Sequence, residues 1–295
     1  MDELVKRNRR QCISALISCA IVVIFVFIGV TMNLLKMPAG KLDNVGIRTF
    51  YLFTVNSNIF AAICTFAVIP YAIDGLRKKE YVLPDWVVIL MLTGTTAVAL
   101  TFLVTVFLLT PVNGVEKMFT GALFFLHGVC PVVTILAFCL FVTSCKIKVK
   151  QSLFALIPVT IYAIVYFVMV MIVTEENGGW NDIYGFATIV PFWVPTILFL
   201  PLTFGITTLI RLWHNHSFVR RRHNEAQIFL NHFEGKKAEE IIFEMGKARA
   251  KIQPSGDLIV PMLVIKQIVY FTDSELSIED ASKLYLEGYL CAKKQ

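Results

Sequence analysis

Residues 12–35 read CISALISCAIVVIFVFIGVTMNLL, a stretch that contains no Asp, Glu, Lys or Arg. An α-helix needs about 20 consecutive apolar residues to cross the hydrocarbon core of a bilayer, so this stretch predicts a membrane-spanning helix. Five further charge-free stretches of similar length follow it: Phe50–Ile73, Trp86–Leu109, Thr120–Thr143, Ser152–Val173 and Phe186–Ile210. The sequence therefore predicts an all-α, polytopic membrane protein with six transmembrane helices.

Lys and Arg gather in alternate segments between these stretches, which predicts the orientation of the chain. The basic segments carry Lys6, Arg7, Arg9, Arg10, Arg77, Lys78, Lys79, Lys146, Lys148, Lys150, Arg211, Arg220, Arg221 and Arg222. The other connecting segments have few basic residues, and the last of them has three acidic residues instead: Glu175, Glu176 and Asp182. Because basic segments stay on the cytoplasmic side, we expect a multi-pass protein of the cell membrane with both termini in the cytoplasm.

The overall composition supports the same class. Hydrophobic residues make up 57% of the chain and charged residues 16%, which is more apolar and less charged than soluble domains are. The net charge of +6 is explained by the predicted topology and by attraction to anionic lipid headgroups. The sequence therefore predicts membrane lipids as partners and no nucleic-acid binding.

The chain changes character after the sixth stretch, where charged residues alternate with apolar ones at helical spacing. We therefore divide it into a cytoplasmic N-terminus (1–11), a six-helix transmembrane domain (12–213) and a helical cytoplasmic tail (214–295). The sequence does not predict a binding partner for this tail.

Three signals predict the organisation of the tail. Gly235 predicts a break between two short helices. The apolar run Leu258–Phe271 is too short to cross a bilayer, so we expect a packed or amphipathic helix. Ser277 followed by Asp280 predicts a capping box at the start of the last helix.

Neither the cysteines nor the histidines have the spacing of a known metal site. Seven cysteines are scattered along the chain and none lies in an outward segment, so no disulfide framework is predicted. The histidines near and within the tail match no standard ligand pattern: His214, His216, His223 and His232. We expect no metal and no cofactor. Cys130 remains a candidate because it follows His127 by three positions on one helix face.

His127 is the one histidine within a predicted span. Cysteines aside, it is the sole side chain in the spans that can exchange a proton near neutral pH. Gly128 and Pro131 predict a local kink that opens room beside the ring. No acidic residue lies in the spans, so Asp182 of the last outward segment is the one carboxylate that could fold inward to the imidazole. The alternative interpretation is a structural histidine hydrogen-bonded across a helix interface.

A polar cluster lies near the outer end of the second stretch, where polar side chains are costly to hold in lipid: Thr54, Asn56, Ser57 and Asn58. Counted from the predicted helix ends, Thr54 and His127 differ in depth by about 5 Å. A hydroxyl beside an imidazole is the nucleophile–base pair of acyl transfer. Asn58 could orient the hydroxyl or donate to an oxyanion, with Asn56 and Ser57 as further substrate-binding candidates. The alternative is that Thr54 merely bonds a backbone carbonyl one turn back.

Short motifs around these residues resemble those of a known family: Tyr51-Leu-Phe-Thr54 and Phe125-Leu-His127. They are similar to motifs of the androgen-induced and androgen-dependent tissue-factor-pathway-inhibitor-regulating proteins. Longer motifs resemble the bacterial six-helix relatives of that family: Phe53-Thr54-Val-Asn-Ser57-Asn58 and His127-Gly-Val-Cys-Pro131. The resemblance covers about Cys12 to Ile210 and implies an intramembrane threonine hydrolase that cleaves fatty acid esters of hydroxy fatty acids. It also implies that Thr54 is the nucleophile and His127 its base.

Two other classes of function remain. A non-catalytic lipid-binding or assembly protein could use the same polar residues to hold a lipid headgroup or to join helices. A transporter is less favoured, because transporters usually place an acidic side chain or a broken helix pair at the midplane of the bilayer.

Overall fold

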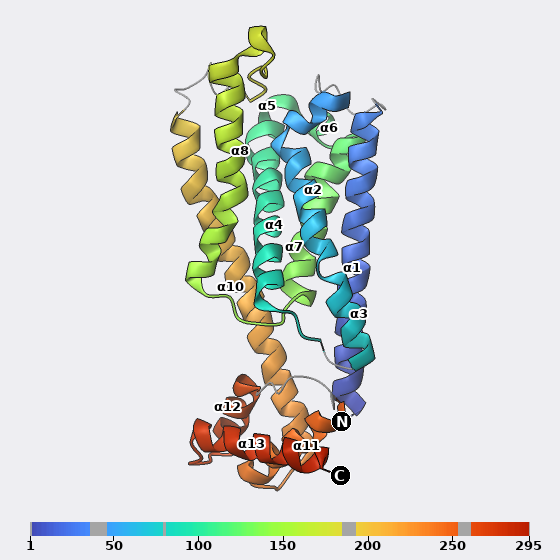
Figure 1. Cartoon of the computed structure of the whole chain (residues 1–295), viewed down its shortest axis with the longest axis vertical. Coiled ribbons are helices and arrows are strands. Elements are labelled where there is room, and N and C mark those ends of the chain that lie inside the picture. The colour runs from blue at the N-terminus through green and yellow to red at the C-terminus, as the bar shows by residue number, and fades with distance from the viewer. Residues whose placement is uncertain (1, 36–45, 79–80, 185–192, 253–260, 295) are drawn as a thin grey trace. The chain divides into compact units, whose positions relative to one another are not determined.

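The computed structural model describes residues 2–35, 46–78, 81–184, 193–252 and 261–294 (Figure 1). These residues form helices and irregular segments, and no β-strand occurs among them. They divide into two compact units, which are described separately. The larger unit comprises Ala15–Ile69 and Leu83–Asn215, and the smaller unit comprises Met1–Ser14, Pro70–Val82 and His216–Gln295.

The helices of the first half of the chain are α1 (Asp2–Leu34), η1 (Gly46–Tyr51), α2 (Phe53–Phe66), α3 (Ile69–Lys78), α4 (Asp85–Val104), η2 (Thr105–Leu109), α5 (Thr110–Asn113), α6 (Val115–Met118), η3 (Phe124–Val129) and α7 (Cys130–Leu136). The second half contains η4 (Ala137–Phe141), η5 (Val149–Leu156), α8 (Ile157–Phe167), η6 (Val168–Val173), η7 (Glu175–Asn177), α10 (Trp193–His232), α11 (Ala238–Ile252), α12 (Met262–Phe271) and α13 (Ile278–Lys293). Of the η elements, η2, η3, η4 and η6 are π-helical and η1, η5 and η7 are 3₁₀ helices.

The part of the chain that the structure describes contains five helical segments long and apolar enough to cross a membrane: Glu3–Leu34, Phe53–Lys78, Asp85–Asn113, Phe124–Phe141 and Val149–Val173. Each overlaps one of the first five predicted stretches, which are confirmed as helices of this length and composition. The sixth stretch, Phe186–Ile210, starts outside the described residues, and α10 covers it from Trp193 onward.

Two of these helices extend beyond the stretches that composition marks as apolar. α1 begins at Asp2, ten residues before the predicted start, and includes the basic N-terminal residues. The second segment continues through α3 to Lys78. Lys and Arg are good helix formers, so a charged flank ends the apolar run without ending the helix.

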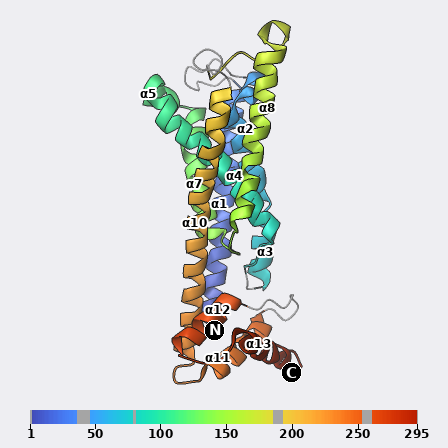
Figure 2. The same cartoon turned by 90° about the vertical axis from the view of Figure 1, so that its left-hand side faces the viewer.

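α4 is the central helix of the larger unit, where it contacts α2, α7 and α8 (Figures 1 and 2). Every residue from Met91 to Thr101 is buried. Gly94 permits the close crossing with α2, because a Cβ atom there would lie 2.9 Å from the Sγ atom of Cys64. In the same way, Gly29 brings α1 against the side chain of Leu126. These close approaches pack α2 against α4 and α1 against the fourth apolar helix.

The smaller unit has its own apolar core, built mainly from the helices of the tail. α11 and α13 cross at two glycines, since a Cβ atom on Gly246 would collide with the backbone of Tyr285 and one on Gly288 with that of Phe243. The buried residues of this core include Phe229, Ile242, Met245, Ile265 and Tyr285.

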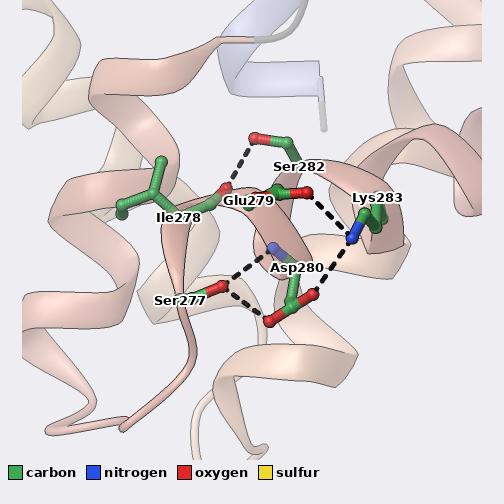
Figure 3. A network of polar contacts seen from close by, with 6 residues as sticks. All are labelled: Ser277, Ile278, Glu279, Asp280, Ser282 and Lys283. Atoms are coloured by element: carbon green, nitrogen blue, oxygen red, sulfur yellow. Dashed lines mark hydrogen bonds and ion pairs between the residues drawn. The ribbon is translucent and has the colours of Figure 1, made fainter.

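The predicted break at Gly235 is confirmed, and so is the helix start at Ser277. Gly235 has φ +81° and lies between α10 and α11. The hydroxyl oxygen of Ser277 accepts a hydrogen bond from the backbone N–H of Asp280 at 3.1 Å, and the same hydroxyl donates to the Asp280 carboxylate at 2.6 Å (Figure 3). The expectation of two short helices around Gly235 is wrong for the first of them, because the residues before it continue the 40-residue helix α10.

Candidate functional site

Thr54 lies in the first turn of α2, whose N-terminus is held by a distant tyrosine. The backbone N–H of Phe53 donates to the hydroxyl oxygen of Tyr184 at 3.0 Å. This bond satisfies one of the N–H groups that a helix start leaves without an intrahelical partner. Thr54 itself is partly exposed, and its hydroxyl forms no hydrogen bond with any described residue. The alternative in which Thr54 bonds a backbone carbonyl is therefore not the arrangement found here.

Asn58 joins α2 to the fourth apolar helix. Its side chain is fully buried, and its Nδ2 atom donates to the carbonyl oxygens of Thr54 at 2.7 Å and Leu126 at 2.9 Å. Both partners can only accept, so the amide nitrogen must face them and the orientation of the amide is fixed. The Oδ1 atom is buried and has no hydrogen-bond partner among the described residues. Both amide hydrogens are therefore engaged, and a role for Asn58 as oxyanion donor would require one of these bonds to break.

His127 lies in the π-helical turn η3, with 4% of its surface exposed. Its Nδ1 atom is 2.8 Å from the carbonyl oxygen of Met118, and its ring meets the ring of Phe119 edge-on at 6.3 Å between centroids. A carbonyl oxygen can only accept, so in the neutral imidazole Nδ1 carries the hydrogen and Nε2 carries the lone pair. Pro131 has no N–H to donate to the carbonyl of His127, as expected where a helix departs from α geometry.

Thr54 and His127 lie on neighbouring helices but are not hydrogen-bonded to one another in the described part of the chain. The bond between Asn58 and Leu126 places these two residues at the same level. Thr54 and His127 are therefore separated along the helix axes by on the order of 7 Å. Their pairing as a catalytic dyad therefore stays a prediction.

Asn56 and Ser57 line a large apolar groove in which neither Thr54 nor His127 takes part. The groove has a volume of about 850 Å³ and lies between α2, α4, η5 and α8. Its lining is almost entirely apolar and aromatic, and the residues are Phe50, Phe53, Asn56, Ser57, Phe60, Trp86, Ile89, Leu90, Thr93, Phe154, Ile157, Pro158, Ile161, Tyr162, Val165 and Trp180. The sequence did not single out this groove, because its members look like any other apolar residues of membrane helices.

The groove is long in the direction of the helices. The hydroxyls of Ser57 and Thr101 are 2.9 Å apart and fix the level of α2 against α4. Trp86 also lines the groove and lies fifteen residues before Thr101, which corresponds to about 22 Å of helix. The groove therefore extends over most of the thickness of a hydrocarbon core, which is about 30 Å.

A cluster of tyrosines adjoins this groove through Tyr162, and it was also missed from sequence. The hydroxyl of Tyr162 donates to the carbonyl oxygen of Tyr51 at 2.6 Å, and the ring of Tyr51 stacks on Trp180 at 4.7 Å. The hydroxyl of Tyr166 donates to the carboxylate of Asp182 at 2.8 Å. Asp182 thus binds a tyrosine of α8, whereas the sequence raised it as a partner for the imidazole. The available signal was the spacing of Tyr162 and Tyr166, which places both on one face of a helix.

The remaining candidates have structural surroundings. Cys130 is buried in an apolar cluster with Val22 and Val26. His214 is buried and stacks on Phe138, with its ring nitrogens 3.2 Å and 3.1 Å from the carbonyl oxygens of Phe138 and Cys145. Within the described ranges, no group of three His, Cys, Asp or Glu residues is arranged to hold a metal ion.

No protein-family model matches the chain, and neither the curated proteins nor the solved structures include a significant match to it. The family resemblance of the short motifs therefore stays a prediction.

The Asn58 amide gives this site a testable property. Replacement of Asn58 by Ala removes two hydrogen bonds, and the one it removes from the carbonyl of Leu126 is buried. We expect the free energy of unfolding to fall by about 1–3 kcal/mol, measured by thermal or denaturant unfolding of the purified protein in detergent. Asn56→Ala is the matched control, since Asn56 is partly exposed and donates only to the nearby carbonyl of Phe50. An equal loss in both variants would show that the link between the helices contributes little.

Proposed function

We propose that this protein binds the acyl chain of a membrane lipid in the groove between α2, α4 and α8. The groove itself is the observation that carries this proposal: its volume of about 850 Å³ lies in the upper range of small-molecule sites, and its lining is apolar. Water would find few hydrogen-bond partners there, so a hydrocarbon chain could replace it without leaving polar groups unsatisfied.

The polar residues at the edge of the groove suggest how the lipid would be oriented. The Nδ2 atom of Asn56 donates once, to the carbonyl of Phe50, which leaves its second hydrogen and its oxygen for a ligand. Tyr162 also lines the groove, and its hydroxyl already donates to the carbonyl oxygen of Tyr51. An ester carbonyl or a headgroup hydroxyl placed against Asn56 would satisfy this amide while the acyl chain follows α8 along the groove.

The proposed topology is a six-span protein of the cell membrane with both termini in the cytoplasm. The five apolar helices support five of the spans, and the charge-free stretch Phe186–Ile210 supports the sixth. The basic segments at the N-terminus, near Arg77 and near Lys148, support the orientation, because they would all face the cytoplasm.

This topology can be tested with epitope tags in intact cells. A tag inserted at Asn177, which lies in the exposed turn η7, is expected to bind antibody from outside. A tag at the C-terminus or at Lys148 is expected to bind only after the membrane is permeabilised. Antibody access to the C-terminal tag in intact cells would contradict an even number of spans with a cytoplasmic N-terminus.

The groove proposal predicts that filling the groove excludes the lipid. Ile161→Trp adds bulk to a lining residue of α8, so labelling of the groove helices by a photoactivatable phosphatidylcholine analogue is expected to fall about fivefold. Ile164→Trp is the matched control, because Ile164 is on the same helix, is similarly exposed (59% against 57%) and does not line the groove. Labelled peptides are counted by mass spectrometry. Equal labelling of both variants would mean that the lipid does not enter the groove.

Hydrolysis of a lipid ester is the second candidate function, and the hydrogen bond between His127 and Met118 favours it. With Nδ1 donating to the carbonyl, Nε2 is the atom that can accept a proton. In the reaction, Nε2 takes the proton of the Thr54 hydroxyl while the hydroxyl oxygen attacks the ester carbonyl carbon. The alcohol then leaves with that proton, and water releases the fatty acid from Thr54. The substrate class is that implied by the family resemblance, a fatty acyl ester of a hydroxy fatty acid.

The dyad has a kinetic signature. Thr54→Ala and His127→Ala are each expected to lower the rate of hydrolysis of such an ester by about three orders of magnitude or more. The double variant should hydrolyse the ester almost as fast as either single variant, because the effects of groups that act as a unit are not additive. Cys130→Ala serves as the control and should retain activity. Loss of activity in Cys130→Ala with retention in Thr54→Ala would replace the hydroxyl mechanism by a thiol mechanism, and absence of turnover in the wild type would leave lipid binding as the function.

A further inference from the structure

The segment between η4 and η5, residues 142–148, is fastened to other parts of the larger unit by polar side chains. Asn215 of α10 pairs with the backbone of Ile147, since its Oδ1 atom accepts from the N–H at 2.8 Å and its Nδ2 atom donates to the carbonyl oxygen at 2.9 Å. The hydroxyl of Ser144 accepts from the N–H of Leu83 at 2.8 Å and donates to its carbonyl oxygen at 3.3 Å. Residues 142–148 are called the connecting segment below.

His214, the residue before Asn215, adds a contact that depends on a proton. Its side chain is fully buried, its Nδ1 atom is 3.2 Å from the carbonyl oxygen of Phe138, and its Nε2 atom is 3.1 Å from that of Cys145. A carbonyl oxygen can only accept, so both ring nitrogens must carry hydrogen for both bonds to form. A neutral imidazole has one N–H, so it makes one of the bonds and turns a lone pair toward the other oxygen.

Two features around His214 favour the doubly protonated ring, the imidazolium. Phe138 belongs to the last turn of η4, and the carbonyls at the end of a helix lack intrahelical donors and carry partial negative charge. The ring of His214 also stacks on that of Phe138 at 4.5 Å between centroids, where the face of an aromatic ring attracts a cation. Burial opposes the charge, and the two hydrogen bonds offset this cost.

Other charged or titratable side chains lie on the elements around His214. In the described part of the chain they are Arg211 and His216 on α10, Cys139, Cys145, Lys146 and Lys148 on η4 and the connecting segment, and Asp85 on α4. Burial raises the pKa of the Cys145 thiol to about 12, and the Cys139 thiol donates to the carbonyl of Ile210 at 3.9 Å, so both thiols are neutral. Lys146 and Lys148 are exposed, so solvent reaches the connecting segment and can take up or supply a proton there.

We propose that His214 is a proton-sensitive clamp that fastens the connecting segment to α10. The imidazolium donates to the carbonyls of both Phe138 and Cys145. Loss of one proton to solvent releases one of these carbonyls, which leaves Asn215 to hold the segment on α10. A histidine ordinarily gains its second ring proton near about pH 6.5. The clamp therefore stabilises the fold below that pH, and this stabilisation is lost as the pH rises.

The test measures the apparent melting temperature of the full-length protein in detergent between about pH 5.5 and pH 8.5. In His214→Gln the side chain keeps hydrogen-bonding groups but gains no charge in acid. The wild type is expected to lose about 2–4 °C more than His214→Gln as the pH rises, which corresponds to one buried hydrogen bond in a chain of this size.

Two variants serve as controls on the same helix. His216→Gln removes the exposed histidine two positions further along α10, and its pH dependence should follow that of the wild type. Asn215→Ala removes the two bonds to Ile147, which do not depend on a proton, so it should lower the melting temperature by a similar amount at every pH.

Hydrogen–deuterium exchange of the wild type keeps the proposal testable if His214→Gln does not fold. After correction for the intrinsic effect of pH on exchange, protection of the Ile147 amide is expected to fall about fivefold between about pH 6 and pH 8, whereas the amides of α4 keep theirs. The same pH dependence of the melting temperature in His214→Gln and the wild type would overturn the proposal. Unchanged protection of the connecting segment at the two pH values would also overturn it.

Discussion

The buried amide of Asn58 determines where the second and fourth apolar helices meet, and the candidate site depends on it. An amide without water must find its partners inside the protein, and here both of its hydrogens are used by backbone carbonyls on two different helices. The bond to Leu126 sets the level of His127, and the bond to Thr54 ties the same amide to the first turn of α2. Small residues complete the arrangement, since Gly29 lets α1 approach Leu126 from another side. A hydrophobic side chain could fill the same space but could not fix this register.

The polar side chains of α2 lie in two different environments. Asn56 and Ser57 face a long apolar groove, whereas Asn58 is buried against the fourth apolar helix. The proposed lipid site and the proposed dyad therefore lie beside the same short helix without sharing a lining. Binding and hydrolysis make separate demands on the protein, and a lipid could occupy the groove whether or not chemistry takes place at Thr54.

Much of the fold could be predicted from sequence, because membrane helices depend on one strong local signal. A charge-free run of sufficient length has few alternatives to a helix, and five of these runs are helices long and apolar enough to span. The cap at Ser277 was equally local, since it needs only the spacing to Asp280. Helix ends were less predictable. Basic residues end the apolar run of α1 but not its helix. Ile228 and Phe229 belong to the 40-residue helix α10 and not to a separate short helix.

The candidate site was predictable in its residue types but not in its contacts. Counting residues from helix ends placed Thr54 and His127 at neighbouring depths, and the Asn58–Leu126 bond agrees with neighbouring helices. The partner of the imidazole was not predictable, because Met118 is the last residue of the short helix α6, which lies outside the fourth stretch. The groove and the tyrosine cluster consist of side chains that only the packing of the helices brings together. The hydrogen bond between Tyr166 and Asp182 also depends on this packing, so it could not be predicted from sequence.

The π-helical geometry of η3 makes the orientation of His127 sensitive to chain length. A π turn holds one more residue than the α turn it replaces, so it is the local trace of a single-residue insertion. Deleting one residue between Phe124 and Leu126 would let the helix return to α geometry, and each residue position corresponds to about 100° of rotation. The imidazole would then leave the carbonyl of Met118 and turn to a different neighbour, although every side chain of the site would still be present. In this protein the length of one helical turn, as much as the identity of its residues, determines which nitrogen of His127 faces the carbonyl of Met118.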